Sequence, residues 1–259
     1  SRRYFLKSSG PPVVTFWMAH PLAQAAEKAM AAPAKTVALD QVDGFVAIDA
    51  KGNVTVYSGK VDLGTGVSTA LTQIAAEELS VPFERVKLVQ GDTALTPDQG
   101  NTWGSLTIQA GGMQIRQACA TAREALLGQA AQKLGVARGE VTVKDGVCSA
   151  GGKNVSYAGL VGAKRFEMKV DPKAPLKPPA QYTIVGKSIN RLDIPAKVTG
   201  TFTYMHDYKR PGMLHARVVR PAGMQATLQS VDDSAAKKIP GYVATVRKGN
   251  FLAVVAKNE

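Results

Sequence analysis

A chain of 259 residues is long enough for one large domain or two small ones. Hydrophobic residues make up 45% of it and charged residues 20%, a balance that allows a packed core and excludes a disordered polymer. The net charge is +12, and the basic residues are spread along the chain apart from the pairs Arg2-Arg3 and Lys237-Lys238. This spread argues against a basic stripe that binds nucleic acid. A basic surface could instead attract an acidic partner protein or an anionic ligand.

The first residues match an export signal. Residues 1–7 fit the twin-arginine pattern S-R-R-x-F-L-K at every defined position, and Ala23-Gln24-Ala25 offers a small-residue cleavage site. The apolar stretch between them contains prolines and is shorter than the roughly 20 apolar residues that a membrane span needs. We therefore expect residues 1–25 to be a signal segment that sends a folded, cofactor-loaded protein to the periplasm. The Ala-rich residues 26–40 are expected to be a tether.

The next part of the chain, residues 41–163, mixes strand and helix patterns. Three short strands are expected, over residues 44–49, 53–57 and 86–89. A helix is expected from Val67 to Leu79, with Glu77 and Glu78 lying outside its apolar face.

A second helix is expected over residues 108–134, after a long loop that begins at residue 91. Gly111-Gly112 near its start indicates close backbone packing. A hairpin is expected around Asp145-Gly146.

Two cysteines are too few for an iron–sulfur cluster, which takes about four thiolates, so any such cluster would belong to a partner. Cys119 is expected to be a small buried residue of the second helix, and Cys148, after a turn, to be more exposed. The three histidines are isolated and show no metal-ligand spacing.

The pattern changes after a segment rich in lysine and proline, residues 164–184, which is typical of an extended linker. The following module, residues 185–259, is expected to contain a short helix over residues 233–238. Its expected strands are residues 202–204, 214–219, 243–246 and 251–255.

Two glycine turns precede the two helices. Gly64-Thr65-Gly66 would let the first-turn amides and the positive end of the helix dipole face an anion, and Gly104-Ser105-Leu106-Thr107 would do the same with two added hydroxyl groups. Taken alone, such a turn is more often a tight connection without a ligand. Neither turn fits a dinucleotide-binding or P-loop pattern.

Residues 46–127 resemble the molybdopterin-binding subunit of the xanthine dehydrogenase/aldehyde oxidase superfamily, in its exported bacterial branch of isoquinoline, nicotinate and aldehyde dehydrogenases. The motifs that carry this resemblance are the segments at residues 59–67, 73–79, 90–93, 96–98 and 104–108. The segments at residues 186–187, 191–193, 197–200, 211–216 and 230–232 carry a second resemblance, of residues 185–259 to the hammerhead module of the same family. The resemblance implies an α+β fold: a mixed sheet/helix portion of the molybdopterin-binding domain, followed by an α/β hammerhead-like module.

The resemblance also implies a cofactor, molybdopterin with molybdenum, usually a cytosine dinucleotide in bacteria. Gly64, Thr65 and Gly66 would approach the molybdenum end and the pterin. Gly104, Ser105, Leu106 and Thr107 would hold the pterin phosphate. Many relatives have glutamine where Thr65 stands, and the threonine side chain reaches less far.

The implied reaction is the oxidation of aldehydes or N-heterocycles with water as the oxygen source. Electrons would pass to an iron–sulfur small subunit and onward to a cytochrome c subunit, and a partner would associate the complex with a membrane. The family's catalytic glutamate lies further downstream, so we assign no catalytic residue here and expect the remainder of the molybdenum subunit as a continuation or a separate chain. The alternative is a non-catalytic exported cofactor-binding or assembly protein of the same fold.

Overall fold

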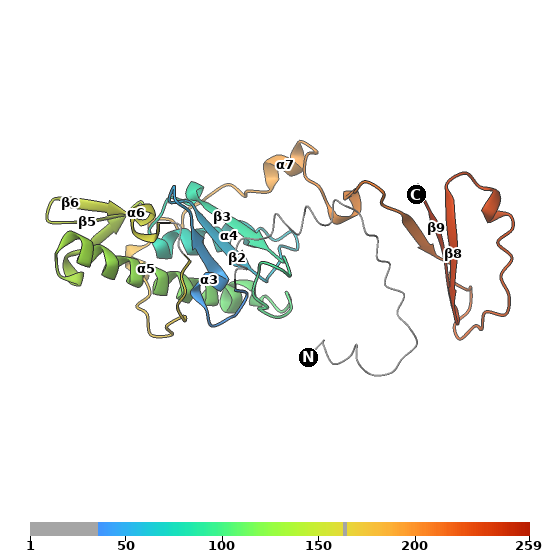
Figure 1. Cartoon of the computed structure of the whole chain (residues 1–259), viewed down its shortest axis with the longest axis horizontal. Helices are drawn as coiled ribbons and strands as arrows, with labels where there is room; N and C mark the ends of the chain where they lie inside the picture. The colour runs from blue at the N-terminus through green and yellow to red at the C-terminus, as the bar shows by residue number, and fades with distance from the viewer. Residues whose placement is uncertain (1–35, 163–164) are drawn as a thin grey trace. The chain divides into compact units, whose positions relative to one another are not determined.

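The computed structural model describes residues 36–162 and 165–259. The predicted twin-arginine segment and most of the predicted tether lie outside the described residues. The chain divides into two compact units, one ending at Ile194 and the other running from Pro195 to Glu259 (Figure 1). Residues 185–194, which the sequence assigned to the second module, therefore group with the first unit.

A three-stranded sheet forms one layer of the first unit, in the order β1 (Val46–Ile48), β2 (Val54–Ser58), β3 (Val86–Gln90). Strand β1 is antiparallel to β2, and β3 is parallel to it. The predicted first strand begins later than expected, because α3 (Val42–Phe45) takes up its start. This helical turn brings Val42 and Phe45, three residues apart, into the core together.

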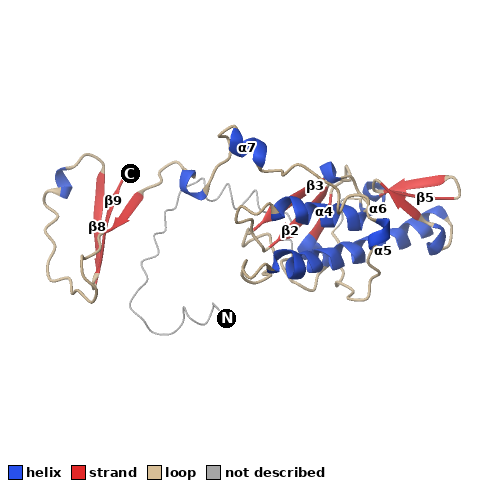
Figure 2. Cartoon of the chain, turned by 180° about the vertical axis from the view of Figure 1, so that it is seen from behind, coloured by secondary structure: helices blue, strands red, loops and turns tan. Residues whose placement is uncertain are grey.

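Helices α4 (Val67–Leu79) and α5 (Met113–Leu134) lie side by side in both views and pack on this sheet (Figures 1 and 2). Helix α5 follows a π-helical segment, η2 (Thr107–Gly112). The close packing predicted at the glycine pair is confirmed: a Cβ on Gly111 would lie 2.8 Å from Cγ of Lys60, and one on Gly112 would lie 3.1 Å from Cδ1 of Ile74.

A second small sheet packs against α5. Strands β4 (Thr142–Lys144), β5 (Val147–Ala150) and β6 (Lys153–Ser156) are antiparallel, and α6 (Tyr157–Val161) follows them. The prediction that Cys148 is exposed is wrong, because the alternation of β5 turns Cys148 and Ala150 toward the core.

The segment after this sheet is not a free linker. Residues 171–193, here called the strap, contact α4 through two glutamates that were predicted to lie outside its apolar face, and contact α5 through Arg116 and Arg123, which donate to strap carbonyls. Glu77 and Glu78 are 2% and 1% exposed. Glu78 forms ion pairs with Arg116 and Arg123 of α5 and accepts the Lys177 amide at 2.9 Å. These partners offset the cost of burying the carboxylates. The spacing of apolar residues in the sequence does not reveal such partners, so it predicted that both glutamates would lie outside the apolar face.

The second unit contains a sheet in the order β7 (His215–Val218), β9 (Phe251–Ala256), β8 (Tyr242–Lys248), with antiparallel pairing. Helix α7 (Ile194–Val198) leads into it. The strand predicted over residues 202–204 does not form; Phe202 and Tyr204 instead contact each other edge to face, with ring centroids 4.8 Å apart. The helix predicted over 233–238 is reduced to a 3₁₀ turn, η6 (Ala236–Lys238). The α+β class expected from the sequence is confirmed.

Candidate functional site

The two glycine turns predicted from the sequence line one pocket of about 380 Å³ in the first unit. Thr65 comes from the turn before α4, Gly104 and Ser105 come from the turn before η2, and Thr107 is the first residue of η2. The full lining consists of Val61, Leu63, Thr65, Val67, Thr102, Trp103, Gly104, Ser105, Thr107 and Ile108. Gly64, Gly66 and Leu106 adjoin the pocket in sequence without lining it. Two segments about forty residues apart are therefore brought to one place, with a volume typical of ligand sites.

The first turn is held by a carboxylate that the sequence interpretation missed. Gly64 and Gly66 adopt φ angles of 95° and 80°, which favour glycine. Asp62 accepts the amide of Gly64 at 2.8 Å and the amides of Gly66 and Ser68 at 3.1 Å. Burial raises the pKa of Asp62, but the hydrogen bonds from Ser68, Gly66 and Gly64 outweigh it and leave the pKa below its ordinary value.

This contact corrects the role predicted for the first turn. The amides of Gly64 and Gly66 do not face an anionic ligand, because a carboxylate of the chain already accepts them. The first turn thus suits a neutral or polar part of a ligand, and Thr65 is the residue of this turn that lines the pocket. The pattern D-x-G-x-G before a helix was the signal that could have revealed this.

The second turn keeps the features expected of an anion site. Gly104 and Ser105 have φ angles of 56° and 58°, and the left-handed conformation is uncommon for serine. The chain then enters η2, whose first amides lack partners within the helix and lie at its positive end. Ser105 and Thr107 add hydroxyl donors at the same edge of the pocket. π-Helical segments of this kind are frequent at functional sites.

An apolar rim surrounds these polar groups. Leu63 is 70% exposed, Trp103 69% and Ile108 39%, and all three line the pocket. A large aromatic side chain that is exposed beside hydrogen-bond donors can cover the face of a flat heterocycle. The pocket therefore offers a stacking surface and an anion-binding edge together.

The strap reaches the first turn. A Cβ on Gly66 would lie 2.9 Å from Nε of Arg191, and the amide of Leu192 donates to Oγ1 of Thr69 at 3.0 Å. Asp193 pairs with Arg191 at 2.7 Å. Residues 191–193, which the sequence assigned to the other module, thus contact the helix start that carries Thr65.

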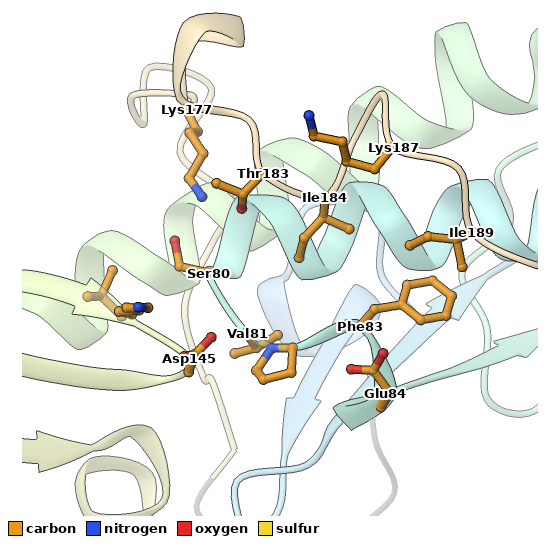
Figure 3. Close-up of a pocket in the computed structure, with 13 residues that line it drawn as sticks. Ser80, Val81, Phe83, Glu84, Asp145, Lys177, Thr183, Ile184, Lys187 and Ile189 are labelled. Carbon is orange, nitrogen blue, oxygen red and sulfur yellow. The ribbon is translucent and has the colours of Figure 1, made fainter.

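A larger pocket of about 630 Å³ lies elsewhere in the first unit (Figure 3). Lys177, Thr183, Ile184, Lys187 and Ile189 of the strap form one side of it, and the segment after α4, with Phe83 and Glu84, forms the other. It contains none of the residues predicted for the site, and its Lys177 ammonium already pairs with Glu77. We therefore take the smaller pocket between the turns as the candidate site.

No group of three or more histidine, cysteine, aspartate or glutamate side chains within residues 36–162 and 165–259 could hold a metal ion. In the same part of the chain, no helix combines the length and apolar character that crossing a membrane requires.

Comparison with known proteins defines the family. Residues 22–216 match the model of the molybdopterin cofactor-binding domain, and the chain belongs to this family. The resemblance to the molybdenum-containing subunits of the xanthine dehydrogenase/aldehyde oxidase superfamily is thereby confirmed.

Individual similar proteins show how much of a relative the chain covers. A nicotinate dehydrogenase subunit of Pseudomonas putida is 43% identical over 83% of this chain and 19% of its own length. The beta subunit of isoquinoline 1-oxidoreductase from Brevundimonas diminuta is 28% identical, covering 100% of this chain and 38% of its own length. The chain thus spans between a fifth and two fifths of these relatives. The solved structure of quinoline 2-oxidoreductase from Pseudomonas putida 86 is 34% identical over 46% of this chain and 15% of that chain, with a TM-score of 0.40.

The residues present fit a phosphorylated pterin. The second turn supplies amides and hydroxyls for a phosphate, and Trp103 supplies a face for a fused ring. A dithiolene cofactor carries its own metal ligands, so no cluster of protein ligands is required of the pocket.

Proposed function

We propose that the pocket between the two glycine turns binds molybdopterin, in the cytosine dinucleotide form, with its phosphate at the second turn. The observation that carries this proposal is that both turns, identified separately in the sequence, line the same pocket. The match to the molybdopterin cofactor-binding domain supports the identity of the ligand.

The chain's own residues divide the work of binding. The first amides of η2 and the hydroxyls of Ser105 and Thr107 hold the phosphate, and Trp103 packs on the ring system. Asp62 keeps the first turn in its left-handed conformation, so that Thr65 faces the pocket. The bound cofactor supplies the two-electron redox chemistry, for which the protein offers binding, orientation and electrostatics.

For the whole protein, we propose the oxidation of an N-heterocycle or an aldehyde with water as the oxygen source. Relatives named nicotinate dehydrogenase and isoquinoline 1-oxidoreductase support this substrate class. Both relatives are named as subunits, which supports the presence of partner chains. We propose that electrons pass to an iron–sulfur subunit and then to a cytochrome c subunit. The catalytic glutamate expected for the family belongs to the remainder of the molybdenum subunit in this proposal.

We further propose that the protein is exported to the periplasm after folding. The support is the match of residues 1–7 to the twin-arginine pattern. Replacing Arg2-Arg3 by Lys-Lys in the complete gene should retain the protein in the cytoplasm, as measured by cell fractionation, whereas unchanged export would refute this part of the proposal.

The cofactor assignment is tested by the double variant Ser105→Ala/Thr107→Ala in the purified complex. Loss of both hydroxyls should lower the molybdenum and pterin content by about tenfold, since hydrogen bonds to a charged group are the stronger kind. Molybdenum is measured by mass spectrometry and the pterin by fluorescence after oxidation. Ser149→Ala/Thr142→Ala, on the distant β4–β5 hairpin, is the matched control.

Unchanged occupancy in the site variant would refute the phosphate contacts. A wild-type complex that contains molybdopterin but oxidises neither N-heterocycles nor aldehydes would favour the non-catalytic alternative. A wild-type complex without molybdenum or pterin would refute the proposed function as a whole.

A further inference from the structure

Lys60 is buried without an acidic partner. It is 3% exposed, and within residues 36–162 and 165–259 it forms no ion pair. Its ammonium instead donates to two backbone carbonyls, those of Gly100 at 3.3 Å and Asn101 at 2.5 Å. Burying a cation is costly unless hydrogen bonds satisfy it. A buried lysine whose ammonium has only carbonyl partners therefore indicates that its role is to hold those two carbonyls in place.

The two carbonyls belong to the loop that leads into the second turn. Gly100 and Asn101 directly precede Thr102, Trp103, Gly104 and Ser105, which line the candidate pocket. The stem of the lysine passes Gly111 so closely that a Cβ on this glycine would lie 2.8 Å from Cγ of Lys60. The lysine therefore connects the end of β2, the loop and the start of the long helix.

Gln99 makes a second connection between the same three parts. Its Oε1 accepts the Ser58 hydroxyl at 2.9 Å and the Gly59 amide at 3.0 Å. Its Nε2 donates to the Gly111 carbonyl at 3.1 Å and to Oε1 of Gln114 at 2.8 Å. All four contacts are made to other residues of the chain, and together they use both N–H donors and both oxygen lone pairs of the Gln99 side-chain amide.

One neighbouring contact joins the segments at residues 58–61 and 99–102, and another ties Lys60 to the end of β3. The amide of Val61 donates to Oγ1 of Thr102 at 3.0 Å, and Nε2 of Gln90 donates to the carbonyl of Lys60 at 3.0 Å. Residues 58–61, which lead to the first turn, are thus tied to residues 99–102, which lead to the second. The separation of the two turns is set by these contacts, because each turn follows its tied segment by only a few residues.

We propose that Lys60 and Gln99 are positioning residues that hold the loop at residues 98–105 against the end of β2, and so set the second glycine turn opposite the first. They act through the backbone of the loop and do not line the pocket. This inference rests on the proposed function for the identity of the ligand. The positioning of the loop can be measured without the ligand.

The experiment compares Lys60→Met and Gln99→Leu in the purified complex by hydrogen–deuterium exchange. Each should raise exchange of the Val61 amide, which donates to Oγ1 of Thr102 in the loop, by about tenfold or more, because each variant removes hydrogen bonds that hold the loop in place. Molybdenum content should fall in the same variants. Lys60→Arg should restore protection at least in part, since a guanidinium can donate to both carbonyls. Lys87→Met, which removes an exposed lysine from β3, is the control and should leave both measurements unchanged.

Protection of the Val61 amide that is unchanged in both Lys60→Met and Gln99→Leu overturns the proposal. If Lys60→Met fails to fold, as judged by circular dichroism, Gln99→Leu carries the test, because it removes no charge. Molybdenum absent from the wild type would refute the proposed function but not this inference, which the exchange data decide. A loaded wild type with equally loaded, equally protected variants would refute the inference and leave the function standing.

Discussion

Oε1 of Glu77 lies 2.8 Å from Nζ of Lys177, a residue one hundred positions later in the chain. The other carboxylate oxygen accepts the amides of Thr183, Ile184 and Val185 at 2.8, 2.6 and 3.0 Å. One buried carboxylate thus holds both a cation and three consecutive amides of the strap against α4. Because the strap continues to Arg191 at Gly66, this pair fixes the path of the chain up to the candidate site.

Replacing Glu77 by glutamine should lower the free energy of unfolding by about 2 kcal/mol at neutral pH, since hydrogen bonds to a charged group contribute about that much. Burial raises the pKa of Glu77, but the Lys177 contact and the three amides outweigh it and hold the pKa below its ordinary value of 4.5. A carboxylate whose pKa is lowered by folding stabilises the fold at any pH above its pKa in the unfolded state. This contribution is lost as the pH falls through its pKa in the folded state.

The difference between wild type and Glu77→Gln should therefore be constant at neutral pH and shrink below about pH 4.5. Urea unfolding monitored at several pH values measures it. Glu84→Gln, at an exposed glutamate of η1 (Phe83–Arg85), is the control and should change stability by less than about 0.5 kcal/mol. A pH-independent difference would contradict the assigned ionisation.

Replacing Asp62 by alanine should loosen the first turn, because the amides of Gly64, Gly66 and Ser68 lose their acceptor. Loss of a side chain that caps a helix start typically costs about 1 kcal/mol. Exchange of the amides at residues 64–68 should increase and cofactor content should fall. Asp92→Ala removes a comparable contact, to the amides of Ala94 and Leu95 in an exposed turn, and should not affect cofactor content. Full occupancy in Asp62→Ala would show that the turn does not need this carboxylate.

Two glycines of the long helical stretch should respond to alanine in opposite ways. Gly111→Ala places a methyl group against the stem of Lys60 and should destabilise the protein by about 1–3 kcal/mol. Gly128→Ala in α5 meets nothing within 4 Å and should stabilise it by about 0.5–1 kcal/mol, because alanine is the better helix former. Thermal unfolding of both variants tests the pair, and an equal shift in the same direction would refute the packing argument.

Neither cysteine of this chain should react with thiol reagents in the native protein. Burial raises the pKa of Cys148 to about 11 and raises that of Cys119 further. At about pH 8 the thiolate that reacts is therefore scarce as well as shielded. Alkylation followed by peptide mass spectrometry should find both sites unmodified until denaturant is added. Rapid native labelling of Cys148 would restore the exposed position that its sequence context suggested.

Periodicity and turn chemistry predicted much of the first unit. The apolar spacing from Val67 to Leu79 matched α4, and the glycine pair at residues 111 and 112 correctly predicted close packing. The two glycine turns could be found because positive φ angles are needed at fixed places before each helix. These signals are local, so a single sequence carries them.

Positions that depend on distant partners could not be predicted in this way. Charged residues such as Glu77, Glu78 and Lys60 are usually exposed to solvent, yet all three are buried in this fold. The lysine- and proline-rich strap likewise has the composition of a linker. Its ordered path depends on contacts across about a hundred residues of sequence.

The sequence by itself determined the family, the positions of α4 and α5, and the two turns, because local pattern and motif residues suffice for these. Only the tertiary structure decided that the turns share a pocket, that Asp62 already occupies the amides of the first turn, and that Lys60 and Gln99 tie the loops together. The physical reason is that a charged or polar side chain is buried only where folding supplies its hydrogen-bond partners, and those partners lie far away in the chain.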